Sequence, residues 1–523
     1  MRKLKLTLLA ALFLPVTMFS QTAEITGVKN VSISSSNSIS TKYDTKGYYM
    51  FYKLEKADKG FVNYKLEIFN DNLAATHSVV LKKPKNSYLL EGKFNGTHFC
   101  FSYMNYKLKT LEYDVYDLEG KKTGSYTIKD IDKNYFYTIY TQIQAEDSYY
   151  SGGVLEVPNK GFVLMYAKDA KGLKISVDMI DNTGKKKWTV KSGNADKAYE
   201  NANLLFADEE NVFLTVDSKP SAMSKEFNSE LLYINVTSGK VVSKTDFSNK
   251  THFFWPFGVD FDETNKEYLV YGEYYGKKNG KLNLKAKEGF FVTQLSKDGK
   301  LSDSKTISWQ KDFKSKISVS DKGKMEDGVG IFVHKILRLK NGKYYVVAEQ
   351  FNKTASGAGI ASAVLSGGNR SGVSTSQVTI LNMIVITLTN DFKVEDVNII
   401  EKKKSRVLLP PGAGYVNENA LGLYVKTYGG FDYNYTSVNR TNDNFNIVYV
   451  NYDKSQKESK GDSKYYTGII GLDASEKVTE TKLNLKTKPT FFNVMRSKAG
   501  YIILFEYFKK QKKATFRMEK LDI

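Results

Sequence analysis

A polar turn phrase returns along this chain and constrains its fold more than any other feature of the sequence. The phrase reads "VYDLEGKKTG", then "MIDNTGKKKW", "INVTSGKVVS" and "QLSKDGKLSD". Its glycines, Gly120, Gly184, Gly239 and Gly299, follow one another at intervals of 64, 55 and 60 residues. Asn, Asp and Gly in such turns supply the positive backbone angles that tight hairpins require. One hairpin that returns at roughly regular intervals predicts a repeat architecture.

Each repeat contains a strongly apolar run that is short enough to be a β-strand. The runs are rich in Tyr, Phe, Val and Ile and almost continuously apolar, as expected of strands covered on both faces. An alternating segment follows each run, a third segment follows in the first seven units, and another strand precedes the run in most units. The eight runs are "GYYMFYKLE" (47–55), "THFCFSYMN" (97–105), "GFVLMYAK" (161–168), "NVFLTVDS" (211–218), "EYLVYGEYY" (267–275), "KYYVVAEQF" (343–351), "NFNIVYVNY" (444–452) and "GYIILFEYF" (500–508).

Four antiparallel strands per unit of about 60 residues predict an all-β fold, a β-propeller, because radial packing of such blades covers both faces of the middle strands. The last unit ends one strand short, and residues 23–34 can supply the missing outer strand and close the ring. We expect eight blades in a single domain, residues 21–523, with loop insertions at 352–378 and 401–440. Seven blades, or two tandem all-β domains, are the alternatives.

One turn carries a family resemblance. The phrase D-x-x-G-K-x-x-W, from Asp181 to Trp188, resembles the outer-strand motif of quinoprotein-type propellers, in which the Trp docks between blades. Only this unit has the Trp, so the resemblance supports the architecture and does not imply a quinone cofactor. The whole Lys- and Tyr-rich chain also resembles uncharacterised secreted β-propellers of Bacteroidota-type bacteria, a resemblance that brings no catalytic residues.

The N-terminus predicts export. Residues 1–20 contain three basic residues, an apolar core and then small or polar residues, the pattern of a secretory signal peptide. No later stretch approaches the ~20 apolar residues of a membrane helix. We therefore expect a monomer that is periplasmic, associated with the outer surface or extracellular. The single Cys100 lies in an apolar strand and is expected to be a buried, unreactive thiol.

The net charge of +20, of which the signal segment contributes three, would attract polyanions. The lysines are spread through turns, however, so a solvated surface is favoured over a nucleic-acid groove. The four histidines lack metal-ligand spacing, and no phosphate loop or nucleophile motif occurs, so neither a metal nor a cofactor is expected. The histidines are His77, His98, His252 and His334.

Clustered carboxylates are the remaining candidates for catalysis or calcium binding. Those in "DFDETN" (260–265) and "ADEEN" (207–211) fall where turns join the first and second strands, and there Asp and Asn bond their own backbone, so turn formation is the favoured interpretation. The candidates are Glu146, Asp147, Asp208, Glu209, Glu210, Asp260, Asp262, Glu263 and Asn265.

Three aromatic-rich segments, 134–150, 252–258 and 428–435, are expected to connect one blade to the next across the face that carries ligands. Flat rings beside Asn, Asp and Gln can stack on sugars or grip a peptide, although packing between blades is the competing interpretation. We expect a non-catalytic binding or scaffold protein for a glycan or an envelope protein; a polysaccharide-active hydrolase or lyase is the alternative, and a quinoprotein dehydrogenase a distant third. The predicted ligand-binding residues are Tyr135, Tyr137, Tyr149, Phe254, Trp255, Phe257, Tyr428, Phe431 and Tyr433.

Overall fold

The computed structural model describes most of the chain from residue 21 to residue 521. The described residues are 21–41, 44–54, 58–133, 135–137, 139, 153–168, 174–192, 199–221, 224, 226–313, 317, 329–355, 376–408, 421–422, 425–426, 429–439, 443–453, 464–472, 478–484 and 489–521. The expected signal peptide, residues 1–20, lies outside them. Among the described residues, no helix is long and apolar enough to cross a membrane.

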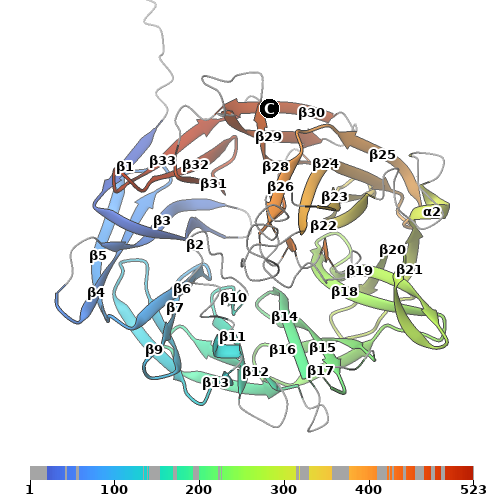
Figure 1. The fold of residues 1–523 in the computed structure, drawn as a ribbon, viewed down its shortest axis with the longest axis horizontal. Coiled ribbons are helices and arrows are strands. Elements are labelled where there is room, and N and C mark those ends of the chain that lie inside the picture. Colours follow the sequence, from blue (N-terminus) through green and yellow to red (C-terminus); the bar gives the residue numbers. More distant parts are fainter. Residues whose placement is uncertain are drawn as a thin grey trace, which may run out of the picture.

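Eight antiparallel sheets are arranged as blades around one axis (Figure 1). In blades one to five and in blade seven the strands lie side by side in chain order; blade six adds β26 beside β24, and blade eight takes β1 as its outer strand. Blades one to four are formed by β2 (Val28–Ser40), β3 (Thr45–Leu54), β4 (Phe61–Asn70) and β5 (Ala75–Pro84); β6 (Ser87–Phe94), β7 (Phe99–Asn105), β8 (Thr110–Tyr116) and β9 (Lys122–Ile128); β10 (Val154–Val157), β11 (Gly161–Lys168), β12 (Lys174–Asp181) and β13 (Lys186–Lys191); and β14 (Tyr199–Ala207), β15 (Asn211–Lys219), β16 (Asn228–Asn235) and β17 (Val241–Asp246).

The second half of the ring repeats this pattern with longer connections. A short helix, α2 (Trp309–Asp312), follows blade five, with Ser308 as its N-cap. Blades five to eight are formed by β18 (His252–Asp262), β19 (Glu267–Lys278), β20 (Lys281–Leu295) and β21 (Lys305–Ser308); β22 (Gly330–Arg338), β23 (Tyr344–Ala355), β24 (Ser376–Leu388), β25 (Val394–Ile400) and an added β26 (Ser405–Leu408) paired with β24; β27 (Tyr433–Asn439), β28 (Asn444–Asp453), β29 (Lys464–Leu472) and β30 (Val478–Asn484); and β31 (Phe491–Arg496), β32 (Tyr501–Phe508), β33 (Lys513–Lys520) and β1 (Thr22–Thr26).

The eight apolar runs of the sequence are the second strands of the eight blades, as predicted. Their side chains form buried clusters, each of which combines two neighbouring blades, including blades eight and one. Between blades one and two, for example, the rings of Phe51 and Phe101 stack with centroids 3.9 Å apart. Removal of this apolar surface from water on both sides of every blade supplies the main stabilisation of the ring.

The N-terminal strand closes the ring, which confirms eight blades. Strand β1 pairs antiparallel with β33, from Thr22 opposite Arg517 to Thr26 opposite Lys513. It is therefore the outer strand of blade eight, while the next strand of the chain, β2, is the first strand of blade one. Ile25 of β1 is buried in the cluster between blades eight and one.

The repeated glycines are contact points between blades. All four have positive φ, from 68° to 87°. A Cβ built on Gly239 would lie 2.5 Å from the ring of Trp188 in the preceding blade, and one on Gly120 would lie 2.6 Å from Val79. The indole Nε1 of Trp188 donates a 2.6 Å hydrogen bond to the carbonyl oxygen of Val236. Trp188 thus docks between blades three and four, as the outer-strand motif implies.

The antiparallel order assigns the turns to two faces. Turns between first and second strands, and between third and outer strands, lie on one face, which we call the turn face. Turns between second and third strands, and the connections from one blade to the next, lie on the other, the connection face. The described ends of the insertions at 352–378 and 401–440 adjoin the connection face, since the first insertion joins β23 to β24 and the second joins blade six to blade seven; residues 356–375, 409–420, 423–424, 427–428 and 440 lie outside the described residues.

Candidate binding site

The first strands of blades five to seven present polar and aromatic side chains toward one another near the axis. A β-bulge organises them: β22 pairs Val333 with Ala348 and then Lys335 with Val347, so His334 has no partner across the sheet. A bulge re-aims the side chains on the bulged strand. As a result, His334 contacts the segment that leads into blade seven, while Lys335 reaches Asp260 in blade five.

Behind the bulge lies a buried ion network that joins blade six to the insertion at 401–440. His334 Nε2 lies 3.3 Å from Glu349 Oε2, and Lys402 Nζ lies 3.1 Å from Glu349 Oε1. The same ammonium group is 2.5 Å from Asp432 Oδ2, which also accepts a 2.7 Å hydrogen bond from the Ser405 hydroxyl. The side chains of His334, Glu349 and Lys402 are inaccessible to solvent.

Burial shifts the pKa values of the acidic and histidine side chains in this network. Desolvation raises the pKa of Asp432 to about 6 despite the nearby Lys402, and it also raises the pKa of Glu349. Desolvation, with Lys426 and Lys402 nearby, holds the pKa of His334 well below its ordinary value, so the imidazole is neutral. A neutral ring that donates from Nε2 to Glu349 leaves Nδ1 as an acceptor, and this buried atom has no hydrogen-bond partner in the described structure. Because the side chains of His334, Glu349 and Lys402 are enclosed, they hold the insertion in place and do not reach a ligand in solvent, whereas Asp432 is partly exposed and is paired with Lys402.

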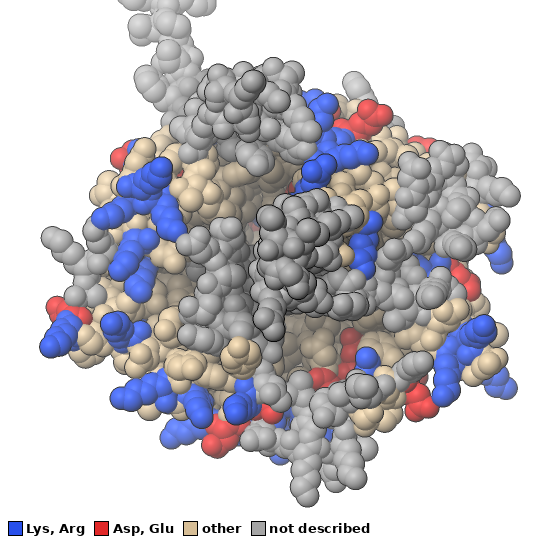
Figure 2. Space-filling model, in the orientation of Figure 1, with Lys and Arg blue, Asp and Glu red and all other residues tan. Residues whose placement is uncertain are grey.

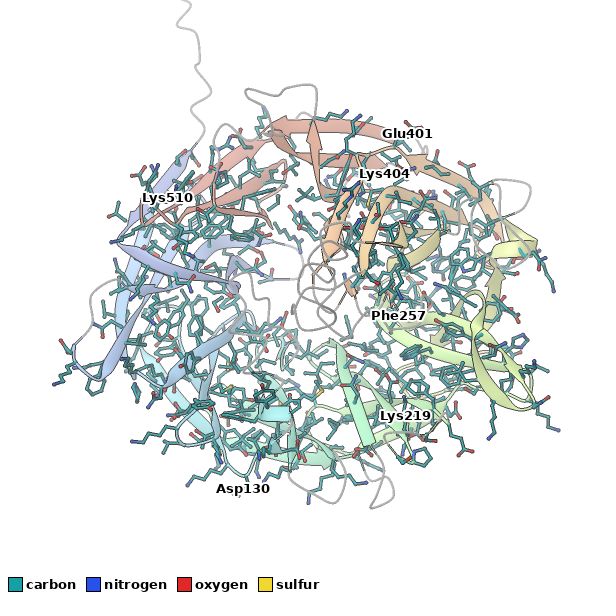
Figure 3. All side chains as sticks on the ribbon, in the orientation of Figure 1. Asp130, Lys219, Phe257, Glu401, Lys404 and Lys510 are labelled. Atoms are coloured by element: carbon teal, nitrogen blue, oxygen red, sulfur yellow. The ribbon has the colours of Figure 1, made fainter. Side chains whose placement is uncertain are left out.

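A ladder of rings lies beside the network. Phe257 stacks on Phe332 with centroids 5.1 Å apart, and Phe332 stacks on Phe431 at 5.0 Å. The ring of Tyr433 stacks on His334 at 4.3 Å. Figure 3 labels Phe257 on the axis side of blade five. The structure therefore brings three of the predicted aromatic residues, Phe257, Phe431 and Tyr433, into one sector; Phe431 is buried, whereas Phe257 and Tyr433 are partly exposed.

The accessible rim of this ladder is positively charged. Lys426 is exposed, and its ammonium group lies 5.1 Å from the centre of the Tyr433 ring, a cation–π contact. Among the described residues, no carboxylate lies within ion-pair distance of Lys426. Lys335, about a third exposed at 30%, is paired with Asp260 at 2.8 Å. Crowding by protein and the nearby Lys335 lower the pKa of Lys426, although its contact with water limits the change. We call Tyr433, Lys426 and Lys335 the axial rim.

Two further predicted aromatic residues, Phe254 and Trp255, do not join the axial rim. Phe254 is buried against Phe291, with ring centroids 5.1 Å apart, and the ring of Trp255 packs edge-on against Phe227 at 5.1 Å. The expectation that 252–258 connects two blades is wrong, since these residues belong to the first strand of blade five. A register shift between Pro256 and Gly258 accommodates the proline there, and proline is tolerated because a first strand is a sheet edge.

The segment after blade two supplies the other candidates. The Tyr135 hydroxyl donates a 3.3 Å hydrogen bond to the Met165 carbonyl oxygen, and its ring packs against the clusters on both sides of blade three. Tyr137, by contrast, is 65% exposed. Tyr149 and Tyr428 lie outside the described residues.

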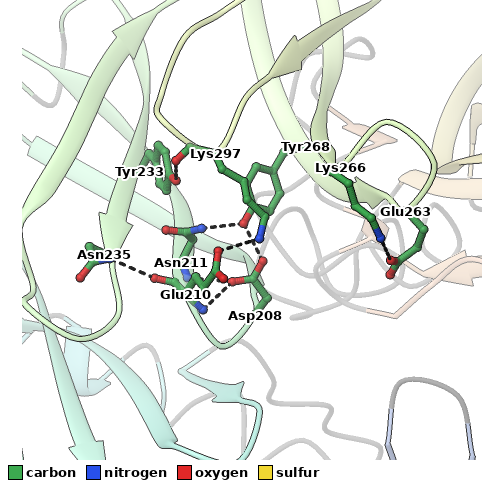
Figure 4. A network of polar contacts seen from close by, with 9 residues as sticks. All are labelled: Asp208, Glu210, Asn211, Tyr233, Asn235, Glu263, Lys266, Tyr268 and Lys297. Atoms are coloured by element: carbon green, nitrogen blue, oxygen red, sulfur yellow. Dashed lines mark hydrogen bonds and ion pairs between the residues drawn. The ribbon is translucent and has the colours of Figure 1, made fainter.

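Two of the clustered carboxylates, Asp208 and Asp262, form turns, as favoured, and Asp260 does not. Asp208 accepts 2.8 Å hydrogen bonds from the backbone N–H groups of Glu210 and Asn211 and a 2.6 Å bond from the Tyr268 hydroxyl, which ties blade four to blade five (Figure 4). Asp262 likewise caps its own turn through the Thr264 N–H.

The exception among the carboxylates is Asp260. It lies within β18 and accepts a hydrogen bond from the Tyr271 hydroxyl in addition to its ion pair with Lys335. Glu146 and Asp147 lie outside the described residues. Within the described part of the chain, no group of three or more His, Cys, Asp and Glu side chains could hold a metal ion.

Eight four-stranded blades closed by the N-terminal strand define this chain as an eight-bladed β-propeller protein. A family model described as "Family of unknown function (DUF6770)" matches residues 1–522, and the chain belongs to that family. A search of curated proteins found no match.

Solved propellers are similar at the level of the fold alone. The β-propeller domain of the Trilobed protease from Pyrococcus furiosus is 11% identical, with 75% of this chain and 99% of that chain covered and a TM-score of 0.34. Prolyl oligopeptidase B from Galerina marginata is 10% identical, with 92% of this chain but 55% of that chain covered and a TM-score of 0.39. The GH93 alpha-L-arabinofuranosidase of Fusarium graminearum is 9% identical, with 75% and 96% covered and a TM-score of 0.32. These similarities are too distant to assign a function.

Proposed function

We propose that this protein is an exported, non-catalytic binding propeller that recognises an acidic glycan at the axial rim. The observation that carries the proposal is the exposed Lys426 above the partly exposed ring of Tyr433, in a described surface without a carboxylate to pair with that lysine. An aromatic face can stack on a sugar ring, and an adjacent ammonium group can bind a carboxylate or sulfate on the same residue. Export to the periplasm, outer surface or extracellular space, as a secreted propeller of the Bacteroidota type, is part of the proposal.

The alternative, a polysaccharide-active hydrolase or lyase, has less support. Such an enzyme needs two carboxyl groups that face each other within ~5 to 10 Å in a cleft. Near Tyr433, the carboxylate of Asp260 forms an ion pair with Lys335, and the carboxyl group of Glu349 is buried away from solvent. These two carboxyl groups are therefore committed to holding the blades and the insertion together.

Binding of uronate-rich and neutral glycans to residues 21–523, at low and high salt, tests the proposal. We expect acidic glycans to be preferred and Lys426→Gln to weaken their binding about tenfold, because a charge-assisted hydrogen bond is worth about 1.5 kcal/mol or more. Tyr433→Leu should weaken the binding of neutral and acidic glycans alike, since it removes the aromatic ring that stacks on the sugar but removes no charge. Tyr137→Ala, an exposed aromatic residue in blade two's connection, is the matched control.

Two results would overturn the proposal. One is glycan binding that survives both Lys426→Gln and Tyr433→Leu. The other is binding that disappears in high salt and ignores both substitutions, because the net charge alone would then account for it. Lys426 is exposed, so Lys426→Gln leaves the fold intact and its result stands even if Tyr433→Leu unfolds.

A further inference from the structure

A second surface lies on the connection face at blades two and three, away from the axial rim. Three segments build it: the turn 106–109 between β7 and β8, residues 129–133 and 135–137 after β9, and Lys168 at the end of β11. They are in contact, since the rings of Tyr106 and Phe136 lie 6.2 Å apart and Ile131 forms a β-bridge with Lys168. The Asp132 N–H also donates a 2.9 Å hydrogen bond to the Ala167 carbonyl oxygen. We call this surface the blade-two shoulder.

Large apolar side chains protrude from the blade-two shoulder. Leu108 and Tyr137 are each 65% exposed and Tyr106 is 50% exposed, which makes these three the most exposed large apolar residues of the described structure apart from Val80. Tyr106 and Leu108 lie on the turn between β7 and β8 and Tyr137 lies in a short helical segment after β9, whereas Val80 lies in the middle of β5. Exposed apolar side chains of this size contribute favourable free energy only when a partner binds and removes them from water.

The charge of the blade-two shoulder is almost entirely positive. Its segments contain five exposed lysines and one exposed carboxylate, Asp130, and in the described structure none of these lysines forms an ion pair. Figure 2 shows Lys and Arg side chains gathered along the lower left rim of the ring, where Figure 3 labels Asp130. The lysines are Lys107, Lys109, Lys129, Lys133 and Lys168.

We infer that the blade-two shoulder docks the propeller on an anionic lipid surface. Exposed apolar side chains on the same segments as unpaired lysines match the interface of a bilayer, where Leu and Tyr enter the headgroup region and lysine stems cover apolar surface while their ammonium groups meet lipid phosphates. A soluble polyanion would use the lysines but would leave Leu108 and Tyr137 in water. This inference is independent of glycan binding at the axial rim, because the two surfaces share no residue.

Sedimentation of residues 21–523 with vesicles tests the inference. The vesicles contain phosphatidylcholine alone or phosphatidylcholine mixed with phosphatidylglycerol, and we expect binding to the mixed vesicles only. Lys107→Gln with Lys133→Gln should weaken that binding about thirtyfold, since each lysine near an anionic surface contributes a factor of about five. Lys250→Gln with Lys510→Gln removes the same charge from exposed lysines in other blades and should have little effect.

A third variant separates lipid from other polyanions. Leu108→Ser with Tyr137→Ser leaves every charge in place and should weaken vesicle binding at least tenfold, because the apolar tips no longer enter the bilayer. The inference is overturned if the protein ignores mixed vesicles, if the control lysine pair matters as much as Lys107 and Lys133, or if this third variant binds like the unmodified protein. Glycan binding by all three variants should remain unchanged, so failure here leaves the axial rim untouched.

Discussion

Replacement of Lys402 by methionine should destabilise the protein and make its stability depend steeply on pH. The ammonium group lies between Glu349 and Asp432 with no solvent contact, and methionine fills similar space without the charge. Removal of one partner from a buried ion pair costs about 3 to 5 kcal/mol, because the remaining charge stays unpaired. We therefore expect the free energy of unfolding to fall by about that amount near neutral pH.

The pH dependence follows from the direction of the pKa shifts. Burial already raises the pKa of Asp432 to about 6 from an ordinary 3.8, so ionisation of this group costs the folded state about 3 kcal/mol above pH 6. When folding raises the pKa of a carboxyl group, the protonated group costs the folded state nothing below the pKa of the unfolded state. The stability is then lost as the pH rises through the pKa of the folded state. Without Lys402 the pKa of both Asp432 and Glu349 must rise further, so the loss in Lys402→Met should shrink as the pH falls from about 7.5 to about 5.

Urea unfolding followed by tryptophan fluorescence at both pH values measures the effect. The neighbouring Lys403 is exposed, so Lys403→Met provides the matched control. Asp432→Asn added to Lys402→Met should recover part of the lost stability, since it removes one of the two unpaired charges. The reasoning is refuted if Lys402→Met and Lys403→Met unfold at the same urea concentration near neutral pH, or if the loss is equal at both pH values.

Two substitutions and one labelling experiment test the closure and packing of the ring. Gly239→Ala should lower the melting temperature more than Gly280→Ala, because both glycines have positive φ but only the Cβ on Gly239 would meet Trp188; the extra cost is about 1 to 3 kcal/mol, and equal shifts would contradict the inter-blade contact. Ile25→Ala should lower the free energy of unfolding by about 2 kcal/mol or more if β1 closes the ring, whereas an unchanged urea midpoint would argue against closure. Burial raises the pKa of the Cys100 thiol well above its ordinary value, so the native protein should resist maleimide labelling that is rapid after unfolding; rapid native labelling would show that the thiol is accessible.

The blades were predictable from the sequence because every strand and hairpin is local. Each second strand lies within about 20 residues of the strands on either side of it, and the turn residues reveal the hairpins. The closing strand was predictable for a different reason: a final unit one strand short needs a partner, and β1 supplies it. Blade boundaries were harder to assign at 252–258, where an aromatic-rich segment was expected to connect two blades but lies in an edge strand, with Pro256 at a bulge.

The buried ion network was not predictable, because its members come from distant parts of the sequence. His334, Glu349, Lys402 and Asp432 lie in separate strands and connections, and none of them belongs to a motif. Asp260 was expected to form a turn together with Asp262, yet it lies within β18 and its carboxylate pairs with Lys335 of blade six. Asp262, two positions further along, lies on the same face of the strand and approaches Arg338 of the same neighbouring blade, in addition to capping its turn.

Buried groups with shifted pKa values lie beside solvent-accessible side chains in this ring, and solvent access separates their roles. Perturbed pKa values often mark functional sites, but structural ion networks perturb them equally. Desolvation shifts the pKa of His334 and Glu349, and the same desolvation keeps any ligand from reaching them. Lys426 and Tyr433 remain in contact with water on the other side of the His334 ring. The enclosed network therefore holds the insertion that carries Lys426 against blade six, and it positions the rim at which we propose glycan recognition.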